Sequence, residues 1–154
     1  MNEKLSIVIP VYNGESSVER LVDTVIAELR GQLELEIILV NDFSPDKSWE
    51  EISKLYEKYP DKVIGINLSK NFGEHNAVMA GYSKCTGDYI VNIDDDFQNP
   101  PSEILKLVNE IKSRQFEVVY TYYEKKKHNI FRNLGSWFNG QVARMMLNKP
   151  KGLY

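Results

Sequence analysis

Short apolar runs alternate with amphipathic stretches along the whole chain. Each run has five or six mostly apolar residues, which is typical of strands buried on both faces of a sheet. The first run is closed by Pro10, and the fourth leads into three consecutive aspartates. The pattern predicts five strands, at residues 5–10, 36–40, 63–68, 89–93 and 118–122.

Between these runs the apolar residues follow a helical spacing. Within 18–29 they recur at intervals of three and four residues, and Gly31 lies just past the end. Ser48, with Glu51 three residues later, forms a capping box that predicts the start of a second helix. Further helices are predicted at 74–84, from Pro100-Pro101 to 111, and at 131–147.

This alternation defines the expected fold class. Strands that alternate with helices at this spacing form βαβ units, which predict an α/β fold: a mostly parallel sheet with helices on both faces. In such sheets ligands bind outside the carboxyl ends of the strands. Polar residues follow several of the predicted strands directly, so the sequence places a ligand crevice at that edge.

Length and composition narrow the class of protein. At 154 residues, with 42% hydrophobic and 27% charged residues, the chain has the size and balance of one globular domain. Its single cysteine, Cys85, excludes a disulfide framework and fits a reducing compartment. It has no apolar run long enough to cross a bilayer and no signal peptide at its start, so we expect a soluble, intracellular chain.

The net charge of −3 hides an asymmetry. Residues 124–154 contain seven basic residues and one acidic residue, a net charge of +6, which leaves 12 basic and 21 acidic groups, or −9, on the rest. Such a basic segment is typical of a region that binds an anionic partner. An equally good interpretation is that its basic residues form only a solvent-exposed helix face and a lysine-rich loop. The acidic body argues against nucleic acid as the partner.

The acidic triplet Asp94-Asp95-Asp96 is the strongest chemical signal. Like charges so close together disfavour joint ionisation unless something positive lies nearby, and no Lys or Arg occurs between Lys84 and Lys106. Asp94 and Asp96 share one side of an extended segment, and Gln98 continues that spacing. Oxygen ligands with open positions suit Mg²⁺ or Mn²⁺. The alternative is an acidic turn that only caps the next helix.

Weaker signals follow the other strands. Asp42 ends a very apolar strand, where a carboxylate either accepts hydrogen bonds from a base or ribose or caps the turn at 44–46. The loop from Lys70 through Asn71 to Gly73 precedes a helix, so its amides and lysine suit an anion. Tyr12, at another strand end, presents a ring for stacking on a base.

Four spaced motifs together resemble family-two glycosyltransferases with the GT-A fold, a Rossmann-like α/β architecture. They are the segments 7–13, 40–46, 71–81 and 87–101, and the resemblance covers nearly the whole chain. The form Asp-x-Asp-x-Gln-x-Pro-Pro at 94–101 is similar to the branch that contains dolichol-phosphate mannose synthase and the bacterial polyprenyl-phosphate glycosyltransferases.

The resemblance implies a role for each matching residue. Contacts to the nucleotide are expected from Pro10, Tyr12, Glu15, Asp42, Lys70, Asn71 and Asp95. Asp94, Asp96 and Gln98 would hold the metal that bridges the diphosphate. Arg132 and Ser136 would face the phosphates of the donor or acceptor, and the catalytic set would be Asp94, Asp96 and Arg132.

The implied reaction is inverting, metal-dependent transfer of a hexose from a UDP- or GDP-sugar to a polyprenyl phosphate. Two alternatives remain: transfer to a sugar hydroxyl during glycan synthesis, and a nucleotide-binding module without catalysis. Residues 1–123 would form the nucleotide-sugar-binding core and 124–154 the start of the acceptor region. Since the family continues beyond this point, the full-length protein is expected at the inner face of the membrane. The amphipathic segment 131–147 would then lie at the lipid surface or cover the sheet.

Overall fold

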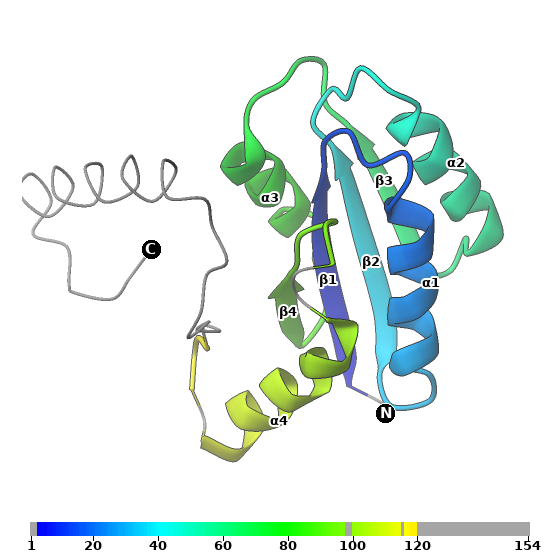
Figure 1. Cartoon of the computed structure of the whole chain (residues 1–154). Coiled ribbons are helices and arrows are strands. Elements are labelled where there is room, and N and C mark those ends of the chain that lie inside the picture. The colour runs from blue at the N-terminus through cyan, green and yellow to red at the C-terminus, as the bar shows by residue number, and fades with distance from the viewer. Residues whose placement is uncertain (1–2, 98–99, 115, 120–154) are drawn as a thin grey trace, which may run out of the picture. The chain divides into compact units, whose positions relative to one another are not determined.

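Four parallel strands form one sheet in the order β3-β2-β1-β4 (Figure 1). This computed structural model describes residues 3–97, 100–114 and 116–119. The strands are β1 (Lys4–Val11), β2 (Glu34–Asn41), β3 (Val63–Asn67) and β4 (Tyr89–Asn92). The predicted fifth strand is not seen at Val118 and Val119, and the rest of it lies outside the described residues.

Helices connect the strands as the apolar spacing predicts. They are α1 (Val18–Glu28), α2 (Ser48–Lys58), α3 (Glu74–Tyr82) and α4 (Ile104–Arg114), the last preceded by the 3₁₀ turn η1 (Pro101–Glu103). Within the described part of the chain, none of these helices combines the length and the apolarity that crossing a bilayer requires. The helix predicted at 131–147 lies outside the described residues.

The predicted capping box at α2 is wrong. Ser48 is the first helical residue and Lys47 occupies the cap position. The carboxylate of Asp46 instead accepts the backbone N–H of Ser48 at 3.0 Å. The Ser48 hydroxyl is buried and accepts the N–H of Gly14 at 2.9 Å, so it joins two loops instead of closing its own helix.

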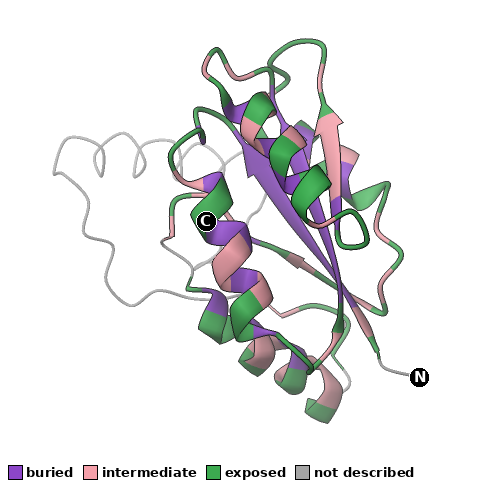
Figure 2. Ribbon diagram, turned by 90° about the vertical axis from the view of Figure 1, so that its right-hand side faces the viewer, coloured by how far each residue is buried: buried purple, intermediate pink, exposed green. Residues whose placement is uncertain are grey.

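The sheet is covered on both faces, as expected. Alternate residues of β1, such as Leu5, Ile7 and Ile9, pack with buried side chains of α1, α2 and α4 in the larger core. On the other face, Val8 packs in a smaller cluster with Ala77 of α3. Figure 2 shows the buried central strands between partly exposed helices. The α/β fold with a parallel sheet and helices on both faces is therefore confirmed.

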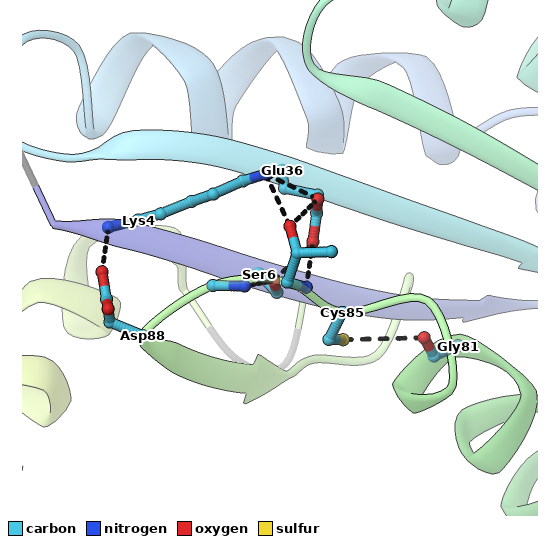
Figure 3. Close-up of polar contacts among 8 residues, drawn as sticks. Lys4, Ser6, Glu36, Gly81, Cys85 and Asp88 are labelled. Atoms are coloured by element: carbon cyan, nitrogen blue, oxygen red, sulfur yellow. Dashed lines mark hydrogen bonds and ion pairs between the residues drawn. The ribbon is translucent and has the colours of Figure 1, made fainter.

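A polar cluster ties the amino ends of the strands together (Figure 3). The Glu36 cluster consists of Lys4 and Ser6 of β1, Glu36 of β2 and Thr86 just before β4. The Glu36 carboxylate accepts hydrogen bonds from Lys4 Nζ at 2.8 Å, Ser6 Oγ at 2.6 Å, and Thr86 N and Oγ1 at 2.8 and 2.7 Å. Burial alone would raise the pKa of Glu36, but these donors outweigh it and lower the pKa to about 2.

The strand order defines where a ligand is expected. The chain moves outward from β1 through β2 to β3, then returns through α3 and places β4 on the opposite side of β1. The order in which successive strands join the sheet therefore reverses between β1 and β4. This is the topological switch point, and α/β sheets bind ligands at its carboxyl end.

Candidate functional site

The loops that follow β1 and β2 are bound to each other at the carboxyl edge of the sheet. Backbone and side-chain hydrogen bonds of 2.9–3.2 Å join Asn13 to Ser44, Gly14 to Ser48, Glu15 to Asp46, and Lys47 to Glu15. In the last of these, the Glu15 carboxylate accepts the N–H of Lys47. The two loops thus form a fixed wall beside the switch point.

Asp42 does not cap the turn at 44–46, which was one of its two predicted roles. Its side chain is only 3% exposed, and its two oxygens accept the N–H groups of Phe72 at 2.8 Å and Gly73 at 2.9 Å. The turn at 44–46 is instead closed by Asn41, whose Oδ1 accepts the N–H of Ser44 at 3.2 Å. Asp42 therefore links the end of β2 to the loop that enters α3.

The aspartate triplet follows β4 and carries unfavourable electrostatics. Burial, and then the negative charges of Glu74 and Asp96, raise the pKa of Asp94 above its usual range. Burial and the neighbouring Asp96 raise the pKa of Asp95 to about 6. The carboxylates destabilise one another in this arrangement, and a cation placed among them would reverse that effect.

Asp95 lies against the first loop. A Cβ atom added to Gly14 would fall 2.4 Å from Asp95 Oδ2 and 2.7 Å from Val11 Cγ1, closer than any real contact. Oδ2 of Asp95 is buried and has no hydrogen-bond partner among the described residues. A side chain at position 14 would therefore displace the Asp95 carboxylate or the Val11 methyl group.

These elements enclose a cavity of about 350 Å³ at the carboxyl edge. It is lined by Pro10, Val11, Tyr12, Asp42, Asn71, Gly73, Glu74, Asp94, Asp95 and Asp96. The ends of β1, β2 and β4 and the loop before α3 all contribute, so residues more than 80 positions apart meet there.

Most of the residues expected to contact a nucleotide line this cavity. They are Pro10, Tyr12, Asp42, Asn71 and Asp95. Asp94 and Asp96, expected to hold a metal, line it too.

Glu15 and Lys70 are the exceptions among the described residues. Glu15 is engaged by Lys47, and Lys70 places its ammonium group 4.9 Å from the centre of the Phe72 ring. Gln98, Arg132 and Ser136 lie outside the described residues.

Two residues that the sequence did not single out also matter. Glu74, the first residue of α3, lines the cavity, and its negative charge helps to raise the pKa of Asp94. Gly14 has no side chain, which leaves space for the Asp95 carboxylate. A glutamate directly after a glycine at a predicted helix start was the available signal for Glu74. Gly14 carried no such signal, since its partner lies 81 residues away.

The side chains present fit a divalent cation only in part. Within residues 3–97, 100–114 and 116–119, no three His, Cys, Asp or Glu side chains are grouped so as to hold a metal by themselves. Carboxylate oxygens are nevertheless the donors that Mg²⁺ and Mn²⁺ prefer, and the buried Oδ2 of Asp95 has no hydrogen-bond partner in the part of the chain that the structure describes. The donor set suits an ion that takes its remaining ligands from water or substrate.

Solved structures share the fold of this chain. A mannosyltransferase from Pyrobaculum calidifontis, in complex with GDP-Man and Mn²⁺, matches 72% of this chain and 33% of its own, with a TM-score of 0.62 and 22% identity. TarS of S. aureus, in complex with UDP, matches 81% of this chain and 40% of its own, with a TM-score of 0.61 and 20% identity. The architecture is the GT-A fold of glycosyltransferases.

The chain belongs to glycosyl transferase family 2, whose sequence profile matches residues 6–152. It is 38% identical over 152 residues to the undecaprenyl-phosphate 4-deoxy-4-formamido-L-arabinose transferase of Photorhabdus laumondii. That alignment covers 97% of this chain and 45% of the relative. The chain therefore spans a little under half the length of the curated relatives it matches.

Proposed function

We propose that this chain binds the nucleotide-sugar donor of a glycosyltransferase along the carboxyl edge of its sheet. The supporting observation is the cavity that brings Asp42 and the aspartate triplet together at the switch point. β2 and β4 lie two strand spacings apart, roughly 10 Å. A nucleoside diphosphate laid across β1 would place its base beside Asp42 and Tyr12 and its phosphates beside Asp94 and Asp96.

The divalent cation would bind at the phosphate end of this site. Asp94 and Asp96, with Gln98, would hold Mg²⁺ or Mn²⁺, and the diphosphate and water would complete its ligands. When bound, the cation neutralises charge on the diphosphate leaving group. The carboxylates orient the donor and keep its anomeric carbon facing the acceptor, which is catalysis by positioning.

For the whole protein we propose transfer of the sugar to a polyprenyl phosphate. The printed name of the Photorhabdus relative includes undecaprenyl phosphate, and this chain matches it over 97% of its own length. A phosphate oxygen of the lipid would form a bond to the anomeric carbon while the bond to the nucleoside diphosphate breaks. This displacement inverts the configuration, and it needs no strong base because the acceptor is already anionic.

Arg132 and Ser136 would contact the phosphates in this scheme, and the basic region 124–154 would approach an anionic membrane at the cytoplasmic face. An assay of sugar transfer by the full-length protein tests the proposed acceptor. A labelled sugar should enter an organic-extractable lipid product with inverted configuration. Incorporation into a water-soluble glycan would instead support a sugar hydroxyl as the acceptor.

The donor site can be tested on the chain itself. Calorimetric titration of UDP and GDP should give binding in the presence of Mn²⁺ that is lost with a chelator and in Asp94→Asn. Glu57→Gln, an exposed position on α2, is the matched control and should bind like the unsubstituted chain. At a hundredfold excess over Kd, binding should raise the free energy of unfolding by about 2.7 kcal/mol. A folded chain that binds neither nucleotide would exclude the donor site.

A further inference from the structure

Phe43 combines two unfavourable features. Its backbone has a φ of 58°, in the left-handed region that a bulky side chain rarely adopts. Its ring is 56% exposed to solvent, so burial of the ring does not compensate for the strain. Glycine at this position would remove both the backbone strain and the exposed apolar surface. Backbone strain of this kind is concentrated at functional sites.

The surrounding contacts hold Phe43 in this conformation. On one side, the Asp42 carboxylate is fixed by the N–H groups of Phe72 and Gly73. On the other side, the Ser44 N–H is bound to Asn41 Oδ1, and the Ser44 hydroxyl accepts the N–H of Asn13. The backbone at Phe43 is therefore held by the contacts that join the loops beside the cavity.

The strand register places Phe43 beside the proposed base site. Val11 is paired with Asn41, and the N–H of Asp42 continues the ladder to Val11 O at 3.0 Å. Tyr12 and Asp42 thus lie at the same level on neighbouring strand ends, and Phe43 is the next residue. Tyr12, which lines the cavity, is itself 50% exposed. Two solvent-exposed aromatic residues therefore lie near Asp42: Tyr12, directly after β1, and Phe43, two residues after the end of β2.

We propose that Phe43 is a donor-binding residue whose ring stacks on the nucleobase of the donor. This inference rests on the proposed donor site and adds to it the surface that recognises the base. Aromatic rings stack on bases of any sequence, and one such contact is typically worth about tenfold or more in affinity. The ring would cover one face of the base, and Asp42 would supply a hydrogen-bond acceptor at the edge of the base.

The proposal predicts opposite effects on stability and on binding in Phe43→Gly. The midpoint of thermal unfolding should stay equal or rise, because glycine adopts a φ of 58° without strain. The Kd for UDP or GDP with Mn²⁺ should rise roughly tenfold. The Kd for pyrophosphate with Mn²⁺ should not change, because pyrophosphate has no base.

Two further variants separate the ring from the loop. Phe43→Tyr keeps an aromatic face and should retain nucleotide affinity, whereas Phe43→Leu should lose it as the glycine variant does. Asn13→Gly changes the other non-glycine residue with a φ of 58° in these two loops, carries no ring, and should bind nucleotides normally.

Equal nucleotide affinity in Phe43→Gly and the unsubstituted chain would overturn the assignment of Phe43 and leave the donor site standing. A parallel loss of pyrophosphate binding would also overturn it, because the ring would then only support the loop. If the folded unsubstituted chain binds neither nucleotides nor pyrophosphate, the donor site itself is overturned, and the role of Phe43 with it.

Discussion

At the scale of single residues, Asp42 serves the structure and the cavity with the same two oxygens. Both accept backbone N–H groups of the loop before α3, and the residue also lines the cavity. A carboxylate oxygen has a second lone pair, so these contacts leave room for a ligand donor. Loss of Asp42 should therefore affect both folding and binding.

Asp42→Asn should lower the free energy of unfolding by about 1–3 kcal/mol. The amide NH₂ group would face the N–H of Phe72 or Gly73, so one partly buried donor would lose the carboxylate oxygen that now accepts from it. Urea denaturation measures this, with the exposed Asp61→Asn as the control. Equal stability of both variants would show that the loop does not depend on this carboxylate.

Gly14→Ala should act mainly on the site. The added Cβ would meet Asp95 Oδ2 at 2.4 Å and displace that carboxylate, so Mn²⁺-dependent nucleotide affinity should fall roughly tenfold or more. In Gly65→Ala the nearest atom is a side-chain methyl group, Ile52 Cγ2 at 2.9 Å, and neither residue lines the cavity. Calorimetry on the two variants compares them, and the prediction fails if both keep full affinity.

At the scale of elements, the sequence correctly predicted the features that depend on local apolar patterns. The apolar runs and helical spacing identified the four described strands and their helices, because burial of one face or both leaves a direct trace in the sequence. It misassigned Ser48, whose hydroxyl serves Gly14 in another loop. It also could not place Asp42 against Phe72 and Gly73, or Asp95 against Gly14. These contacts depend on how distant segments meet in space.

The helix α3 is the most sensitive element, because it approaches the sheet through small residues. Gly81 is buried, and an added Cβ would lie 2.4 Å from Val8 Cγ1 in the smaller core. Gly81→Ala should therefore cost about 1–3 kcal/mol, measured by thermal or urea unfolding. Met79→Ala, at an exposed position of the same helix, should cost far less. Similar losses in both variants would contradict close packing at Gly81.

At the scale of the whole molecule, the Glu36 cluster makes stability depend on pH. The pKa of Glu36 is lowered from 4.5 to about 2 in the folded chain, so its contribution is complete above the unfolded value and is lost as pH falls through the folded value. The full contribution is about 3 kcal/mol, lost between roughly pH 4.5 and 2.

Glu36→Gln isolates this contribution. Because the variant cannot titrate at that position, its stability should fall less steeply with acid than that of the unsubstituted chain. Urea denaturation over this pH range measures the difference between them, which should shrink as the pH drops. Parallel curves would mean that Glu36 does not carry the effect.

The separation of these two regions has a consequence for how the chain tolerates change. Glu36 and Ile90 both pair with Ser6 of β1, and Asp94 follows Ile90 by four residues, so Glu36 and the aspartate triplet are separated by roughly 13 Å along the strands. Over that distance substitutions should combine additively. A substitution that stabilises the amino edge would then raise the free energy of unfolding. The domain would stay folded when a second substitution at the carboxyl edge changes specificity and lowers that free energy.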